Sequence, residues 1–129
     1  MLWGFGIGQS PNVVLILVDD LKPTLGVYGD STAVSPNIDR LANMGTRFDL
    51  AYCNQAVCLP SRYNLLLGAR STSTGIYNFG IDFRSVYPDA VTLPQHFMAA
   101  GYHAESMGKV FHIGHGNTND AASWSIPHR

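Results

Sequence analysis

Charged residues are scarce in this sequence, and their scarcity excludes whole classes of partner. Lys, Arg, Asp and Glu make up 13% of the 129 residues, against ~25% in an average soluble domain. The net charge is −1, and no segment gathers Lys and Arg into the basic surface that binds a phosphate backbone. We therefore expect no nucleic-acid partner.

Long hydrophobic runs and paired cysteines are also lacking. The longest apolar run, from Val13 to Val18, has six residues, whereas a membrane-spanning helix needs about 20, so we expect no transmembrane segment. The two cysteines, Cys53 and Cys58, make no disulfide framework. Hydrophobic residues make up 46% of the sequence. Together with the low content of charged residues, this fits either a domain with a neutral surface or a part of a larger domain, and we favour the second interpretation.

The order of predicted elements is typical of an α/β protein. The continuous β-branched run 13–18 predicts a central strand of a mainly parallel sheet, covered on both faces. Helices are predicted from Ser35, as N-cap, to Gly45, from about Pro60 to Gly68, and from Thr92 to Gly101. A further strand is predicted over 102–107.

Two adjacent carboxylates, Asp19 and Asp20, follow the first predicted strand. In open α/β sheets, ligands bind beyond the carboxyl ends of the strands. Adjacent carboxylates repel each other unless a cation lies between them, and a hard divalent ion is the usual one. The pair therefore indicates a metal site, and the alternative is a solvated turn.

The segment Cys58-Leu59-Pro60-Ser61-Arg62 carries the most specific pattern. Its proline and the apolar residues that follow place Cys58 at a helix N-terminus, where unpaired N–H groups favour an anion. Arg62 adds a permanent cation within one turn. These features leave three interpretations open: an anion-binding helix terminus, a buried small hydrophobe at Cys58, or a thiolate nucleophile there.

The same segment resembles the signature Cys-x-Pro-Ser-Arg of the formylglycine-dependent sulfatases. Residues 12–20 resemble the opening strand and metal pair of that family, and residues 35–41 resemble its first helix. The run Gly108-Lys109-Val110-Phe111-His112 is similar to that of the iduronate-2-sulfatase subgroup. The resemblance implies an alkaline-phosphatase-like α/β/α sandwich, of which residues 11–129 would be an incomplete N-terminal part and residues 1–10 an extension.

The resemblance also implies a chemistry and a role for each residue. Cys58 would be oxidised to formylglycine, whose hydrate attacks the sulfur of a sulfate ester, as on a sulfated sugar. Asp19, Asp20 and residue 58 would bind Ca²⁺, with Mg²⁺ a poorer fit. Arg62 would hold the diol. Two further residues of the site would be Lys109, which neutralises the sulfate oxygens, and His112, which assists proton removal.

The implied partners are a sulfated carbohydrate and a formylglycine-generating or sulfatase-maturing enzyme, in a periplasmic, secreted or lysosomal setting. Sulfatases are several times longer, and their second metal-ligand set has no counterpart here, since Asn119-Asp120 is in the wrong order. The alternatives are a truncated, non-catalytic chain and a phosphate or phosphonate ester hydrolase.

Several residues near these motifs receive simpler interpretations. His112 and His115 have the spacing of a zinc pair, but no suitable third ligand is near. We expect His115 to be solvent-exposed and without a role, and Cys53 to be a free buried thiol. Four aromatic residues are expected in the core or the wall of a cleft: Tyr77, Phe79, Phe83 and Tyr87.

Overall fold

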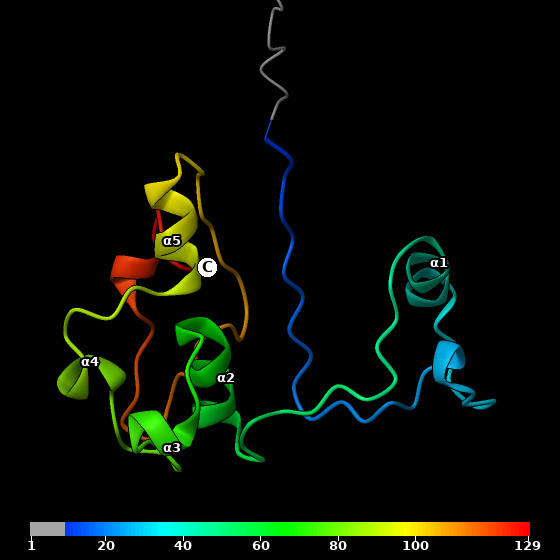
Figure 1. The fold of residues 1–129 in the computed structure, drawn as a ribbon, viewed down its shortest axis with the longest axis horizontal. Helices are drawn as coiled ribbons and strands as arrows, with labels where there is room; N and C mark the ends of the chain where they lie inside the picture. Colours follow the sequence, from blue (N-terminus) through cyan, green and yellow to red (C-terminus); the bar gives the residue numbers. More distant parts are fainter. Residues whose placement is uncertain (1–9) are drawn as a thin grey trace, which may run out of the picture.

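The computed structural model describes residues 10–129, so the expected extension lies almost wholly outside the described residues. The helices fall into two groups (Figure 1), with η1 and α1 on one side, α2 to α5 and η2 on the other, and an extended N-terminal segment between them. Their bounds are η1 Gly26–Tyr28, α1 Pro36–Met44, α2 Cys58–Leu67, α3 Ser71–Thr74, α4 Phe83–Val86, α5 Leu93–Ala99 and η2 Ala121–Ser123.

Helix α1 begins at Pro36 and ends before Gly45, as predicted, with Ser35 at the N-cap position. Ser35 makes no side-chain capping bond at this position, because its hydroxyl is used elsewhere. The Ser35 Oγ accepts a hydrogen bond from the Gly26 N–H at 3.0 Å and donates to the Asp39 carboxylate. These contacts fasten α1 to η1 instead of closing the first turn.

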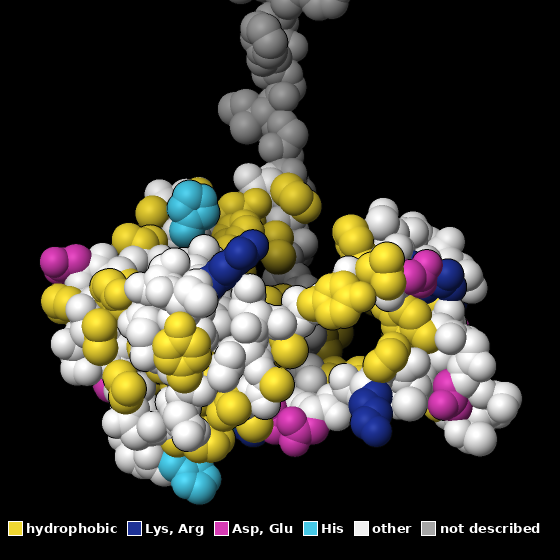
Figure 2. Space-filling model, turned by 60° about the horizontal axis from the view of Figure 1, so that its bottom comes forward, with side chains coloured by type: hydrophobic (Ala, Val, Ile, Leu, Met, Phe, Trp, Pro, Cys, Tyr) yellow, Lys and Arg dark blue, Asp and Glu magenta, His cyan; other side chains and the backbone are white. Residues whose placement is uncertain are grey.

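The apolar stripe of α1 is exposed. Ile38 and Leu41 are 45% and 62% exposed, although such a stripe is typical of a helix that covers a core. The chain that follows is apolar and open as well, with Phe48, Leu50 and Tyr52 at 68%, 80% and 85% exposure. Figure 2 shows hydrophobic side chains spread over much of the face in view.

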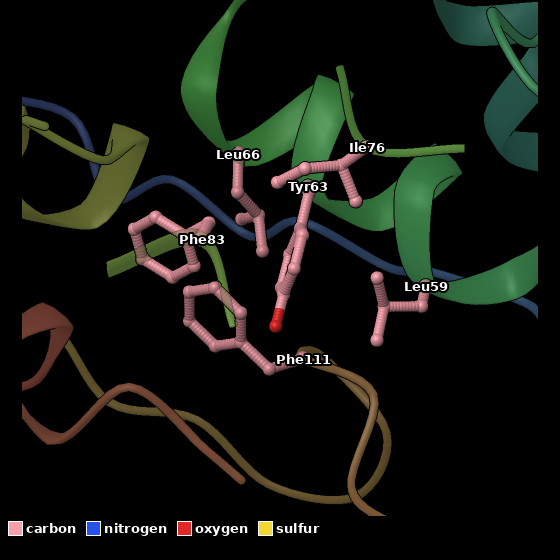
Figure 3. Packing of buried hydrophobic residues seen from close by; sticks show 6 residues of the cluster. All are labelled: Leu59, Tyr63, Leu66, Ile76, Phe83 and Phe111. Carbon is pink, nitrogen blue, oxygen red and sulfur yellow. The ribbon is translucent and has the colours of Figure 1, made fainter. Parts of the chain in front are cut away.

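The core of the described chain is built on α2. This helix begins at Cys58, two residues before the predicted start at Pro60, and ends at Gly68 in the left-handed conformation that glycine readily adopts. The Tyr63 ring lies 5.0 Å from Phe83 between centroids. The buried hydrophobic residues converge beneath the helix (Figure 3) and are Leu59, Tyr63, Leu66, Ile76, Phe83 and Phe111.

The predicted strand over 13–18 is an extended segment without a ladder. No backbone hydrogen bond joins it to another described segment, and Val14 and Ile16 are 80% and 73% exposed. A strand forms only when a neighbour supplies partners for its N–H and C=O groups. In the part of the chain that the structure describes, the one bridge is Gly114 to Asn117, so the mainly parallel sheet stays a prediction.

The segment predicted as a strand over 102–107 has a neighbour along part of its length. The Ser125 N–H donates to Ala104 O at 2.8 Å, the Arg129 N–H donates to Ser106 O at 3.2 Å, and the Gly108 N–H donates to Arg129 O at 2.9 Å. The residue numbers of the bonded positions increase in the same direction along both segments, from 104 to 108 and from 125 to 129. The two segments therefore run in the same direction, as parallel strands do.

Helix α5 follows Thr92, as predicted. Its N-terminus is closed by a capping box, in which Thr92 and Gln95 each bond the backbone N–H of the other. Among the residues described, no helix is both long enough and apolar enough to cross a membrane.

Candidate functional site

The end of the extended segment meets the beginning of α2. One oxygen from each of Asp19 and Asp20 and the sulfur of Cys58 all lie within 4.8 Å of one another. Cys58 is the first residue of α2, where the helix dipole and free N–H groups attract negative charge. Asp20 has a φ of +52°, a left-handed conformation that costs a non-glycine residue roughly 1 kcal/mol. The predicted metal pair thus lies beside the predicted nucleophile position.

Asp19 is the electrostatic centre of this group. Its carboxylate accepts hydrogen bonds from Arg62 Nη2 at 2.8 Å and from Lys109 Nζ. The Lys109 hydrogen bond, followed by that of Arg62, lowers the pKa of Asp19 from its usual 3.8 to about 2. In return, the hydrogen bond that Lys109 donates to the Asp19 carboxylate raises the pKa of Lys109. At neutral pH the ionised Asp19 therefore lies between two cations, Arg62 and Lys109.

Arg62 joins three parts of the chain. Its side chain is 8% exposed, and Nη1 donates to the backbone carbonyls of Lys109 and of Val110, the latter at 3.2 Å. The same guanidinium pairs with Asp19. It therefore fixes the loop that carries Lys109 against α2 and the end of the extended segment.

His112 follows in the same loop and is buried, at 7% exposure. Neither of its ring nitrogens has a hydrogen-bond partner among the described residues. Burial, and then the charges of Lys109 and His115, lower the pKa of His112 below its usual 6.5. At neutral pH the ring is therefore uncharged and able to accept a proton.

A cavity of about 800 Å³ opens at this group. Asp19, Asp20, Cys58 and Arg62 line it, together with Phe79 from the loop after α3. The Phe79 ring lies 4.9 Å from that of His112 between centroids. This ring connects the cavity to the histidine, and the prediction that Phe79 belongs to the core or a cleft wall is confirmed.

Two simpler expectations have different outcomes. Cys53 is free, as predicted, but the prediction that it is buried is wrong: it is exposed and lines the same cavity, because the segment between α1 and α2 lies on the surface. The rings of His112 and His115 stack 5.7 Å apart. Within residues 10–129, the only trio of metal-ligating side chains is Asp19, Asp20 and Cys58, which does not support a zinc pair.

Sequence reasoning missed two features of the site. Asn117 is buried at 4% exposure and binds the loop next to Phe79, and His115 packs on both Phe79 and His112. The signal was the run Gly114-His115-Gly116-Asn117, since two glycines around a histidine indicate a tight turn.

The donor set fits a hard divalent cation in part. Carboxylate oxygens are the ligands that Ca²⁺ and Mg²⁺ prefer, and Asp19 and Asp20 supply them. The thiol of Cys58 is a soft donor that suits these ions poorly. An oxygen-bearing side chain at position 58 would therefore complete the group better than the cysteine does.

Comparison with known proteins agrees with this geometry. Residues 11–125 match the sequence profile of the family described as Sulfatase. The chain is 47% identical over 119 residues to iduronate 2-sulfatase of Homo sapiens. It is 38% identical over 111 residues to a sulfatase of Formosa agariphila, and 36% identical over 121 residues to human N-acetylgalactosamine-6-sulfatase.

These matches take in most of this chain and a minor part of each relative. They cover 90%, 81% and 85% of the chain, and 22%, 22% and 23% of the three relatives in the same order. The matched part contains the Asp-Asp pair, the Cys58 to Arg62 segment and the loop of Lys109 and His112. The chain therefore belongs to the sulfatase family, and its similarity to iduronate 2-sulfatases confirms the predicted resemblance.

Proposed function

We propose that this chain is the part of a sulfatase that carries the nucleophile, and that the protein hydrolyses a sulfate ester on a sulfated sugar. The observation that carries the proposal is the convergence of Asp19, Asp20 and Cys58 within 4.8 Å. Relatives named for sulfated sugars, an iduronate and an N-acetylgalactosamine, support the substrate class.

In this proposal, position 58 is a formylglycine, whose hydrated aldehyde supplies an oxygen nucleophile and a route to regenerate itself. Asp19, Asp20 and residue 58 would hold Ca²⁺, which supplies positive charge that favours the deprotonated nucleophile. The partly exposed position of Cys58, at the cavity and at the start of α2, supports both roles.

The other residues position the ester and move protons. Lys109 neutralises the sulfate oxygens while negative charge shifts toward the leaving oxygen in the transition state. Arg62 keeps Asp19 ionised and fixes the loop of Lys109. As a further proposed role, its guanidinium binds the diol of the hydrated formylglycine. His112, uncharged at neutral pH, accepts a proton at a ring nitrogen.

We further propose that Val13–Val18 is a strand of a mainly parallel sheet in an alkaline-phosphatase-like sandwich. The parallel bonding between the segments around 104–108 and 125–129 supports that sense of pairing. The apolar, exposed side chains on both faces of 13–18 support a strand that other elements would cover.

Mass spectrometry of the chain made with an active formylglycine-generating or sulfatase-maturing enzyme tests the proposal. We expect an aldehyde at position 58, trapped by an aldehyde-specific reagent. Cys53 is the internal control: it lines the same cavity but lacks the Pro-Ser-Arg that follows Cys58, so it stays a thiol. A thiol at both positions would refute the assignment of the nucleophile. Release of phosphate but not sulfate from aryl esters by a matured full-length protein would refute the reaction.

A further inference from the structure

His112 is a buried imidazole whose orientation no hydrogen bond fixes. Its side chain is 7% exposed, and in the described part of the chain neither Nδ1 nor Nε2 has a partner. A buried histidine is ordinarily oriented by a hydrogen bond from one of these nitrogens. The plane of the His112 ring must therefore be set by the rings that pack against it.

Two rings pack against His112 and against each other. The centroid of the Phe79 ring lies 4.9 Å from that of His112 and 4.9 Å from that of His115. The two histidine rings lie 5.7 Å apart with an angle of 22° between their planes. Distances of this size are those of aromatic pairs in direct contact. The three side chains thus form one closed cluster, with His112 on its buried side and Phe79 at the cavity.

The backbone at His115 is unusual for a ring-bearing residue. Gly114 and Asn117 exchange two backbone hydrogen bonds of 2.9 Å, and the residues between them, His115 and Gly116, have φ values of +51° and +82°. This is a two-residue hairpin of type I′, whose first central position favours Asn, Asp or Gly. A histidine there gives up backbone stability and places a ring on His112, and strain of this kind is characteristic of functional sites.

A buried amide fastens this hairpin to the loop of Phe79. Asn117 Nδ2 donates to Ile81 O at 3.0 Å, and the Gly80 N–H donates to Asn117 Oδ1 at 3.0 Å. Asn117 itself is 4% exposed, so water competes little for these bonds. The loops that carry His115 and Phe79 are therefore held in a fixed relation to each other.

We propose that His115 and Phe79 are positioning residues, which orient the His112 ring by stacking and leave both of its nitrogens without a competing hydrogen bond. The inference rests on the proposed function, in which His112 handles a proton of the ester reaction. His115 acts through His112 and does not need to touch the substrate.

Two variants of His115 separate ring stacking from backbone stability. His115→Asn keeps a residue suited to the type I′ turn but removes the ring, so we expect a higher thermal midpoint and a loosened His112. His115→Phe keeps a ring on a backbone that suits it less, so we expect a lower thermal midpoint and an ordered His112. A merely structural role for His115 predicts that stability and the order of His112 change together.

The first readout is NMR of the chain with labelled His and Phe rings, which needs no catalysis. In the unaltered chain, we expect one set of His112 ring signals with cross-relaxation to the Phe79 ring. In His115→Asn, we expect broadened His112 signals and loss of that contact, and in His115→Phe, its retention. Unchanged His112 signals in His115→Asn would overturn the proposal.

The second readout is turnover of an aryl sulfate by a matured full-length protein that contains this chain. We expect His115→Asn to lower kcat about tenfold with KM within about twofold, and His115→Phe to stay near the unaltered kcat, because misorientation of a proton-transfer group affects the transition state and not substrate binding. Equal kcat in all three proteins would overturn the positioning role. A His112→Ala protein with full turnover, together with intact NMR effects, would refute the proposed role of His112 instead.

Discussion

Replacement of Arg62 by Met should destabilise the chain more than any other single change in the site. Methionine keeps most of the buried volume of the side chain and removes its charge and hydrogen bonds. The Arg62 side chain is 8% exposed. Its guanidinium donates hydrogen bonds to Asp19 and to the carbonyls of Lys109 and Val110. Loss of these bonds separates the extended segment and the 109–110 loop from α2.

The magnitude follows from two contributions. Hydrogen bonds from a charged donor are worth about 1.5–3 kcal/mol each, and we take the lower figure for two carbonyls that are not fully buried. The fall in the pKa of Asp19 is shared with Lys109, and the carboxylate is 35% exposed, so solvent screening leaves about 0.5–1 kcal/mol for the ion pair with Arg62. Together these give about 3.5–4 kcal/mol.

Urea denaturation at neutral pH, followed by far-UV circular dichroism, measures this loss. Arg62→Lys is the matched control. It keeps the positive charge, but a single ammonium group cannot bond all three acceptors as the planar guanidinium does. We expect the free energy of unfolding of Arg62→Lys to lie between those of Arg62→Met and the unaltered chain. We also expect the pKa of Asp19 to stay depressed in Arg62→Lys. An Arg62→Met chain within about 0.5 kcal/mol of the unaltered one, the range of an ordinary surface change, would refute the reasoning.

Three further outcomes are expected. Because the folded pKa of Asp19 is about 2 and its usual value is 3.8, its stabilisation is full above about pH 4 and is lost as the pH falls through 2; Asp19→Asn should be less stable at pH 7 and match the unaltered chain in acid unfolding experiments near pH 2. In a matured full-length version, Lys109→Ala should lower kcat/KM for aryl and sugar sulfates by ~10²–10³, more than His115→Ala does on either. The chain of 129 residues should bind Ca²⁺ weakly in calorimetry and release negligible sulfate, because Asp19, Asp20 and residue 58 supply only part of the 6–8 oxygens that Ca²⁺ prefers; rapid turnover by this chain would contradict that.

The three longer helices, α1, α2 and α5, were predictable because their signals are local, whereas the short elements η1, α3, α4 and η2 were not predicted. Pro36 fixes the start of α1, Gly45 and Gly68 follow the ends of α1 and α2, and the Thr92 box starts α5. Each signal acts through the conformation or hydrogen bonding of residues within one turn. The sequence alone therefore predicted these bounds to within about two residues.

Contacts between distant segments were not predictable in this way. Arg62 and Lys109 reach Asp19 across 43 and 90 positions, and nothing in the sequence near Asp19 specifies either partner. Ser35 offered a hydroxyl that suited a cap, but Asp39 and Gly26 compete for it. A strand likewise depends on distant segments, because its backbone hydrogen bonds need a neighbouring strand. The sequence of residues 13–18 therefore indicated an extended conformation but not its partners.

The burial of the Cys58 to Arg62 segment has a consequence for the order of events in biosynthesis. Cys58 is partly accessible, but its neighbours Leu59, Pro60 and Arg62 are buried in α2. A modifying enzyme that reads this segment as an extended peptide cannot reach those side chains once the helix has packed. If Cys58 is converted as proposed, the conversion would therefore have to precede folding, while the nascent chain is still linear. Molecules that fold too early would keep the thiol.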